Sequence, residues 1–213
     1  MLIGADEAYA LWAPEYGRQP NPVLALEMRV LRDRLGPLHA QTVLDAGCGA
    51  GRWMSHLRSR GARVFGLDRS AAMLKHASGS LVRGDINALP FADAGIDLAL
   101  CSMTLGYLAS AENALRELLR VARRVIVTDF HPAALKAGFS RSFRIAGQLY
   151  EIQNYPHFPG CFDTGPATLE WIAEACFAAP ERPLFEAAGK GDAFEAACRT
   201  PVIYAACWSG LTL

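Results

Sequence analysis

The segment VLDAGCGAGRW, residues 43–53, places three glycines directly after a short aliphatic run. Glycine lacks a Cβ, so it reaches backbone angles that other residues avoid and lets a ligand approach the main chain closely. A strand, a glycine-rich turn and a helix in this order bring backbone N–H groups and the positive end of a helix dipole to one point. The segment therefore predicts a ligand-binding turn at the end of a strand.

Short apolar runs and helical patterns alternate along the first 130 residues. The runs cover residues 42–47, 62–68, 97–102 and 123–130, and the helical patterns cover residues 51–61, 70–78 and 112–122. Each run is typical of a strand that is buried on both faces. Strands that alternate with helices predict an α/β fold, in which helices cover both faces of a parallel sheet.

The segments outside this alternation are less regular. Helices are predicted over residues 21–36 and 167–179, and strands around residues 183–189 and 201–209. Residues 131–165 show no clean period but are rich in aromatic side chains, which argues against disorder. We predict that this insert forms a lid over the ligand.

The spacing of the glycines narrows the choice of ligand. A dinucleotide site needs G-x-G-x-x-G, whose third glycine falls five residues after the first. Here Gly47, Gly49 and Gly51 follow G-x-G-x-G, and Arg52 stands where the last dinucleotide glycine would be. A nicotinamide oxidoreductase is therefore disfavoured, although the spacing alone does not exclude it.

These motifs resemble those of the class I S-adenosylmethionine-dependent methyltransferases, particularly the small-molecule branch that includes ubiquinone-biosynthesis methyltransferases. VLDAGCGAG is similar to the first motif of that family, and VFGLDRS is similar to its second. VRGDINALPFADAGIDLALCSMTLGYL is similar to the stretch that carries the adenine-binding acid and the fourth strand. YALWAPEYGRQPNP is similar to the lead-in that caps the cofactor, so the resemblance extends over about residues 9–130.

The resemblance implies a Rossmann-like, doubly wound fold with a mostly parallel seven-stranded sheet and helices on both faces. It implies one methyltransferase domain over residues 1–213. The expected parts are N-terminal cap helices (1–40), a cofactor-binding half (41–130), a substrate lid inserted after the fifth strand (131–165), and a C-terminal helix with the last strands (166–213).

The cofactor implied by the resemblance is S-adenosylmethionine. In that family the acid that ends the second strand, here Asp68, accepts hydrogen bonds from both ribose hydroxyls. By the same resemblance Asp85 accepts from the adenine amino group, and the backbone of Ile86 donates to the ring. The predicted cofactor-binding residues are Tyr16, Asp45, Gly47, Cys48, Gly49, Gly51, Asp68, Arg69, Asp85, Ile86 and Ser102. Asp97, at the start of a strand, is instead predicted to be structural.

Methyl transfer from a sulfonium is an in-line displacement, so alignment and desolvation supply much of its rate. A general base is needed only where the acceptor must lose a proton. His131, just after the fifth strand, and His157, in the insert, are predicted to be catalytic, because a neutral imidazole can take such a proton. The predicted substrate-binding residues are Tyr9, Trp12, Tyr107, Arg144 and Tyr155, with Arg141 as a weaker candidate.

Charge and composition argue against several kinds of partner. The 21 basic residues balance the 21 acidic residues, which leaves no net field to attract nucleic acid or an anionic membrane. The first residues lack the pattern of a signal peptide, and no apolar stretch is long enough to span a bilayer, so a cytoplasmic protein is expected. The six cysteines show no metal-binding spacing, so no metal site is predicted. The expected oligomeric state is a monomer or a homodimer.

The sequence therefore predicts a methyltransferase that uses S-adenosylmethionine on a small apolar or aromatic metabolite, at oxygen or nitrogen. A second hypothesis is a non-catalytic S-adenosylmethionine-binding regulatory or partner protein on the same fold, which a turnover assay would distinguish. A nucleic-acid methyltransferase is disfavoured by the balanced charge. It is also disfavoured because CSMTL stands after the fourth strand, where N/D-P-P-Y/W would be expected.

Overall fold

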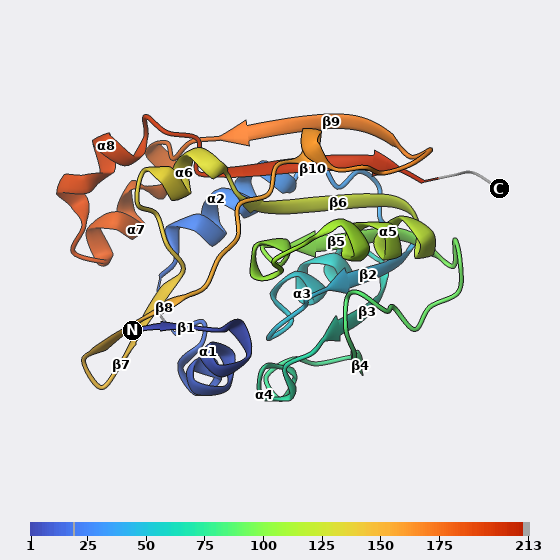
Figure 1. Ribbon diagram of the computed structural model, residues 1–213, viewed down its shortest axis with the longest axis horizontal. Coiled ribbons are helices and arrows are strands. Elements are labelled where there is room, and N and C mark those ends of the chain that lie inside the picture. The colour runs from blue at the N-terminus through green and yellow to red at the C-terminus, as the bar shows by residue number, and fades with distance from the viewer. Residues whose placement is uncertain (19, 211–213) are drawn as a thin grey trace.

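A central sheet of seven strands forms the core of the fold in the computed structural model, which describes residues 1–18 and 20–210. In order across the sheet the strands are β4 (Ser80–Arg83), β3 (Arg63–Asp68), β2 (Thr42–Ala46), β5 (Ile96–Ser102), β6 (Ala122–Phe130), β10 (Ile203–Ser209) and β9 (Thr168–Ala175). The first five are parallel, and β10 runs antiparallel to both of its neighbours (Figure 1). The predicted mostly parallel seven-stranded sheet is confirmed.

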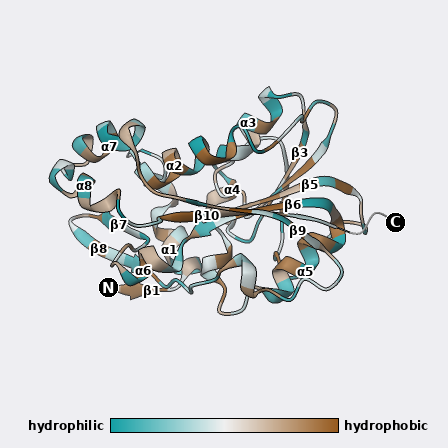
Figure 2. Cartoon of the chain, turned by 90° about the horizontal axis from the view of Figure 1, so that it is seen from above, coloured by the Kyte–Doolittle hydropathy of each residue, from teal (hydrophilic) through white to brown (hydrophobic). Residues whose placement is uncertain are grey.

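Helices cover both faces of this sheet, which explains why its inner strands are apolar along their whole length. The longer helices are α1 (Ala5–Trp12), α2 (Pro22–Leu31), α3 (Arg52–Ser59) and α5 (Glu112–Val121). α2 and α3 lie on one face and α5 lies on the other (Figure 2). Leu26, Trp53 and Leu57 belong to the core beneath α2 and α3, whereas Leu115 and Leu118 belong to the core beneath α5.

Short helices form many of the connections between strands. They are α4 (Ala71–Leu74), α6 (Pro132–Lys136), α7 (Arg182–Ala187) and α8 (Phe194–Ala197), with the 3₁₀ helices η1 (Ala13–Glu15), η2 (Leu105–Tyr107), η3 (Pro159–Cys161), η4 (Ala179–Glu181) and η5 (Gly191–Ala193). Within residues 1–18 and 20–210, no helix has the length and the apolar composition to cross a membrane.

Local capping groups fix where two of the predicted helices begin. Asn21 caps α2, because its side chain accepts hydrogen bonds from the backbone N–H groups of Val23 and Leu24. Ser70 caps α4 by accepting from the backbone N–H of Met73. Both helices end earlier than the sequence pattern predicts, at Leu31 and Leu74.

The C-terminal region corrects two of the sequence predictions. Residues 168–175, predicted as part of a helix, form the edge strand β9, and residues 183–187, predicted as part of a strand over 183–189, lie in α7. In β9 the half-buried residues Trp171, Ala173 and Ala175 alternate with exposed ones, so the period is that of a strand. Around α7, Glu181 accepts a hydrogen bond from the backbone N–H of Ala178, a capping arrangement that favours a helix at this point.

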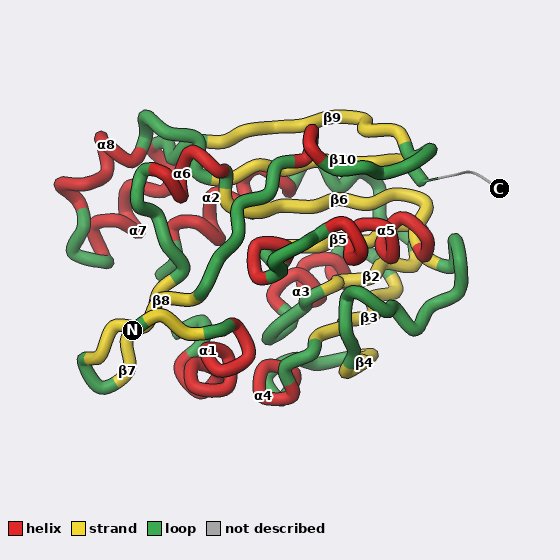
Figure 3. Tube along the Cα trace, in the orientation of Figure 1, coloured by secondary structure: helices red, strands yellow, loops and turns green. Residues whose placement is uncertain are grey.

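The insert after β6 is more regular than the sequence pattern indicates. It contains α6 and a hairpin of β7 (Ser142–Ile145) and β8 (Gln148–Ile152). β8 also pairs in parallel with β1 (Leu2–Ile3), so the first residues of the chain join the insert in a separate three-stranded sheet. After this hairpin the chain runs as an extended loop from β8 back across the main sheet to β9 (Figure 3).

Candidate functional site

A cavity of about 1470 Å³ opens at the carboxyl ends of the parallel strands. Ligands of open α/β sheets bind at this edge. The residues that follow β2, β3 and β5 form one side of the cavity, and α1, η1 and the β7–β8 hairpin form the other. Pockets for one small ligand have volumes of roughly 300–1000 Å³, so this cavity has room for two ligands side by side.

The glycine turn after β2 forms the part of the wall that lies closest to the sheet. Gly47, Gly49 and Gly51 all have positive φ angles, of 78°, 53° and 81°, which only glycine adopts without strain. A Cβ at Gly47 would lie 2.3 Å from Oγ1 of Thr104, so no larger residue fits there. The turn therefore keeps its main chain close to the cavity.

Two acids follow the turn at the next strand ends. Asp68, the last residue of β3, accepts hydrogen bonds from the backbone N–H groups of Gly49 and Ser70, each at 2.8 Å. Burial raises the pKa of Asp68, and these two N–H groups oppose the shift. Asp85 lies beyond β4, where its Oδ1 accepts from the backbone and side chain of Asn87. Both acids line the cavity, and each carboxylate has lone pairs left for a ligand.

Asp45, in β2, is the most deeply buried acid of the cavity wall. The residue is 1 % exposed, and its Oδ2 has no hydrogen-bond partner within the described chain. Burial raises its pKa to about 7, with further raising contributions from Glu27 and Asp68 and an opposing one from Arg52. An unpaired buried carboxylate is costly, so a cationic group of a ligand would relieve this position.

A group of polar side chains lies behind the glycine turn. Glu27 of α2 is fully buried and accepts hydrogen bonds from Arg52 and Trp53 of α3, from Ser102 of β5 and from Thr128 of β6. One carboxylate thus joins two helices to the two central strands. Glu27 could not be predicted from sequence, because nothing in its own segment indicates a buried acid.

Aromatic residues from the N-terminal segment form the opposite wall. The hydroxyl groups of Tyr9 and Tyr107 are hydrogen-bonded to each other. Trp12 stacks on Phe143 of the insert, with ring centroids 4.8 Å apart, and meets Tyr16 edge-on at 4.9 Å. Burial raises the pKa of Tyr9 and Tyr107, and it raises that of Tyr16 to about 12. These tyrosines are therefore neutral hydrogen-bond donors at physiological pH.

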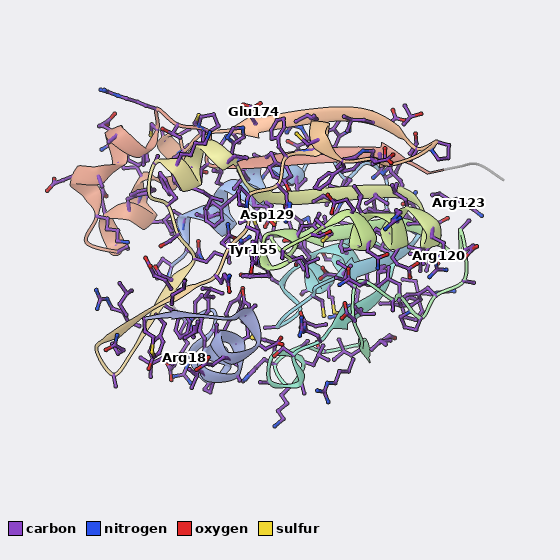
Figure 4. The ribbon with its side chains drawn as sticks, in the orientation of Figure 1. Arg18, Arg120, Arg123, Asp129, Tyr155 and Glu174 are labelled. Atoms are coloured by element: carbon purple, nitrogen blue, oxygen red, sulfur yellow. The ribbon has the colours of Figure 1, made fainter. Side chains whose placement is uncertain are left out.

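A buried ion pair joins the insert to the sheet at the same wall. Arg141 contacts Asp129 at the end of β6, with Nη2 2.5 Å from Oδ1, and its guanidinium stacks over the ring of Tyr107 at 4.4 Å. Asp129 also accepts from the backbone N–H of Gly106. Tyr155 of the insert donates its own N–H to the Gly106 carbonyl, which places it near Asp129 (Figure 4).

Most of the residues predicted for the site line this one cavity. They are Tyr9, Trp12, Tyr16, Asp45, Gly47, Cys48, Gly49, Asp68, Arg69, Asp85, Ile86, Ser102, Tyr107 and Arg144. Gly51 and Tyr155 do not line it: a Cβ at Gly51 would lie 3.2 Å from the Cβ of Ala77, so that glycine lets the start of α3 pack closely against the loop after α4.

Neither of the two histidines predicted to be catalytic lines the cavity. His131 caps α6, where Nδ1 accepts from the backbone N–H of Ala133, and its Nε2 lies 3.5 Å from Glu174 of β9. His157 is hydrogen-bonded to the carbonyl of Leu108 and lines a separate hollow of about 540 Å³. Because His131 follows β6, it lies at the carboxyl ends of the parallel strands, as predicted. Its side chain, however, points toward β9 and not into the cavity.

No group of three or more histidine, cysteine or acidic side chains is arranged to hold a metal ion in the part of the chain that the structure describes.

Residues 44–137 match the family described as "Methyltransferase domain". This stretch contains the glycine turn and both acids that follow it.

Curated relatives extend the similarity. The malonyl-[acyl-carrier protein] O-methyltransferase of Erwinia pyrifoliae is 41 % identical over 61 % of this chain and 52 % of its own length. The demethylmenaquinone methyltransferase of Corynebacterium kroppenstedtii is 30 % identical over 72 % of this chain and 68 % of its own length. The chain spans about half, or less, of the length of the malonyl-carrier relatives it matches.

Solved structures share the fold at low identity. One solved structure is named as a putative S-adenosylmethionine-dependent methyltransferase from Listeria monocytogenes. It superposes with a TM-score of 0.68 at 18 % identity, covering 89 % of this chain and 100 % of that one. The [4+2]-cyclase SpnF superposes with a TM-score of 0.66 at 15 % identity, covering 98 % of this chain and 96 % of that one. The fold alone therefore does not determine the reaction.

Proposed function

Since the chain belongs to the S-adenosylmethionine-dependent methyltransferases, we propose that it transfers the methyl group of this cofactor to a small apolar or aromatic acceptor. The observation that carries the proposal is that one continuous cavity joins the residues predicted to bind the cofactor to an aromatic wall and exceeds the volume that one ligand needs. The enzyme would therefore hold donor and acceptor together while the methyl group moves.

The residues of the first wall fit this cofactor. Asp68 has free lone pairs for two vicinal ribose hydroxyls, and Asp85 and Ile86 border the same cavity on the side of β4, where the adenine would lie. The unpartnered Oδ2 of Asp45 matches a cation, and the cofactor carries both an ammonium and a sulfonium group. The glycine turn lets the cofactor lie against the main chain.

The second wall supports an acceptor with apolar or aromatic character. Trp12 and Phe143 offer stacking surfaces, and the cavity continues between α6, α7 and α8, where Phe139, Phe177 and Phe185 line it. Apolar walls with a few polar groups are typical of small-molecule sites. The relatives are named for two different acceptors, a malonyl group on a carrier protein and demethylmenaquinone, so their names do not select one for this chain.

Alignment and desolvation carry the proposed reaction, without a histidine. When bound, the cofactor would supply a methyl group activated by its sulfonium sulfur, which a lone pair of the acceptor would take in an in-line displacement with a neutral thioether as the leaving group. The hydroxyls of Tyr9 and Tyr107, on half-buried side chains that line the cavity, can orient an acceptor oxygen, because both stay protonated. Holding the reactants in line and excluding water supplies a large part of the rate of such a step.

Calorimetry with S-adenosylmethionine and its demethylated product tests the cofactor site. We expect micromolar affinity, about −8 kcal/mol. Asp68→Asn should weaken binding by roughly 10-fold to 100-fold, because the ribose hydroxyls lose a charged acceptor, at a total cost of about 1.5–3 kcal/mol. Asp97→Asn is the matched control: Asp97 accepts from the backbone N–H of Thr42 and pairs with Arg123, away from the cavity. Equal losses in the two variants would refute the assignment of Asp68.

Turnover is tested separately with methyl-labelled cofactor and a metabolite extract. The wild-type protein should label an acceptor, and Asp68→Asn should label less of it at sub-saturating cofactor. Tight cofactor binding with no labelled product in any fraction would instead support the regulatory or partner protein. Binding of NAD in place of S-adenosylmethionine would contradict both.

A further inference from the structure

The segment that follows β5 lies between the two walls of the cavity. Ser102, the last residue of β5, and Met103 and Thr104 after it all line the cavity. A Cβ at Gly47 would lie 2.3 Å from Thr104 Oγ1, so this segment touches the glycine turn. Further along the chain, Tyr107 belongs to the aromatic wall. Met103 therefore lies where the predicted cofactor side of the cavity meets the predicted acceptor side.

The backbone of Met103 has a conformation that methionine rarely adopts. Its φ angle is 53°, in the left-handed region. In the part of the chain that the structure describes, the other non-glycine residues with positive φ are Ala40, Ala94 and Ala146, which lie in turns and do not line the cavity. A long side chain in this region is an outlier, and such outliers cluster at binding and catalytic sites. Of these four residues, Met103 alone lines the cavity.

Elsewhere the cavity wall has glycine where the chain takes this conformation. Gly17, Gly47 and Gly49 line the cavity and have φ angles of 79°, 78° and 53°. Glycine would also adopt the backbone angles of Met103 without strain. The side chain of Met103 is therefore present at a cost in backbone energy, which indicates that the side chain itself has a role in the cavity.

Buried groups on two sides hold this strained backbone in place. The N–H of Met103 donates to the carbonyl of Thr128 at 2.8 Å and to its Oγ1 at 3.3 Å, and the carbonyl of Met103 accepts from Nη2 of Arg141 at 3.1 Å. Thr128 is fully buried in β6, and Arg141 is paired with Asp129. Hydrogen bonds from the sheet and from the insert therefore fix the point on the cavity wall from which the Met103 side chain extends.

The side chain offers an apolar and adaptable contact. Met103 is half-buried and packs against the core beneath α2 and α3. Methionine is unbranched and polarisable, and its sulfur makes favourable contacts with aromatic rings. An apolar group where donor and acceptor meet also excludes water from the reacting atoms. These properties fit an acceptor whose methylated atom lies on or next to an apolar or aromatic group.

We propose that Met103 is a specificity-determining residue: its side chain is the apolar contact for the reacting end of the acceptor, and it selects which acceptors reach the methyl donor. The assignment rests on the proposed function, because it concerns the acceptor of that reaction. It deepens that function by placing the selection of the acceptor at one strained position after the central strand β5.

Two truncations of Met103 separate the side chain from the backbone. Met103→Ala removes the side chain beyond Cβ and keeps the strain, whereas Met103→Gly removes it and relieves the strain. In differential scanning calorimetry, Met103→Gly should therefore unfold about 2–4 °C above Met103→Ala. Ala94→Gly is the matched control, since it relieves the same backbone conformation outside the cavity and should raise the unfolding temperature without changing methyl transfer.

Methyl transfer is measured with labelled S-adenosylmethionine and a metabolite extract at saturating cofactor. Both truncations should label the wild-type product about 10-fold to 100-fold more slowly than wild type, relative to the other fractions, because the acceptor loses its alignment. Both should bind the demethylated cofactor within about 3-fold of wild type in calorimetric titrations. Met103→Leu, which keeps an apolar side chain of similar volume, should retain the wild-type product.

A purely structural role predicts the opposite pattern, in which methyl transfer follows stability. Wild-type labelling in Met103→Gly, or an unchanged distribution of label in Met103→Ala, overturns the assignment of Met103 and leaves the proposed function standing. A higher unfolding temperature for Met103→Ala than for Met103→Gly overturns the strained backbone on which the assignment rests. If Met103→Ala does not fold, Met103→Gly is compared with Met103→Leu, and equal labelling in the two overturns the assignment. A wild-type protein that binds the cofactor but labels no acceptor overturns the proposed function itself.

Discussion

At Asp45 the protonation state that stabilises the ligand-free fold differs from the one that would bind a cation. Its pKa is raised to about 7 by burial, from 3.8 for an ordinary aspartate. The folded state therefore favours the protonated form. The stability contributed by this group is fully present below about pH 4 and is lost as the pH rises through 7. A cationic ligand would reverse this effect by pairing with the ionised form.

Asp45→Asn should therefore stabilise the ligand-free protein at pH 8 and change it little at pH 4.5. Each kcal/mol corresponds to about 2–4 °C in the unfolding temperature of a chain of this size, so a rise of several degrees is expected at pH 8. Differential scanning calorimetry at the two pH values checks it, with Asp97→Asn as the control. The same change in unfolding temperature at both pH values would contradict the raised pKa.

The residues that could be predicted from sequence are those whose role depends on local spacing. The glycines, Asp68 and Asp85 follow strand ends at fixed distances, so the pattern alone brings them to one edge. Arg52 and Glu27 are 25 residues apart and meet only through packing of α2 against the turn. The side-chain direction of His131 could not be predicted for a related reason: a strand end predicts the edge of the sheet but not the side to which the next side chain points.

At the scale of elements, α7 depends on a residue that precedes it. Glu181 is buried, accepts from the backbone N–H of Ala178, and forms two hydrogen bonds with Arg29 of α2, at 2.8 and 3.0 Å. This single carboxylate caps the 3₁₀ helix η4, which leads directly into α7, and ties it to the helix that carries Glu27. Because Phe185 of α7 lines the cavity, the same contact positions part of the wall that we propose for the acceptor.

Glu181→Ala should lower the free energy of unfolding by about 2–4 kcal/mol, since it removes a helix cap and leaves Arg29 without its partner. Glu186→Ala, an exposed position on the same helix, should change it by no more than about 0.5 kcal/mol. Urea denaturation of both variants measures the difference. Similar losses in the two would mean that α7 does not depend on this cap.

Strands could be predicted from sequence where the spacing of the apolar residues fits only one kind of secondary structure. β2, β3, β5 and β6 are continuous apolar runs, and the structure confirms them within one residue. In β9 the leucine, tryptophan, isoleucine and alanine residues fit a helical period as well as an alternating one, and only pairing with β10 decides between them. β1 has two residues, too few for any period.

At the scale of the whole molecule, the N-terminal segment and the insert form one cover over the cavity. β1 pairs with β8, and the hydroxyl groups of Tyr9 and Tyr107 join α1 to η2 at the end of β5. Trp12 and Phe143 stack between the two parts. Contacts of this kind make two segments that are distant in sequence open and close together.

Tyr9→Phe should therefore increase amide hydrogen exchange in residues 148–152 as well as in α1, because it weakens the cover as a unit. The measurement is hydrogen exchange with mass spectrometry, with β10 in the sheet core as the internal control. Saturation with the demethylated cofactor should reduce exchange in both segments together. An increase confined to α1 would show that the two parts open independently.

The position of β10 between β6 and β9 has a consequence for synthesis on the ribosome. The strand that fills the gap follows both of its neighbours in the sequence, so β6 keeps an unpaired edge, and β9 has no neighbour, until residue 209 has left the exit tunnel. Through that interval the nascent chain presents an apolar strand with free N–H and C=O groups, the form most prone to pair with another copy. The half that carries the glycine turn is complete by then, and S-adenosylmethionine in the cell would meet a finished cofactor wall before the sheet has closed.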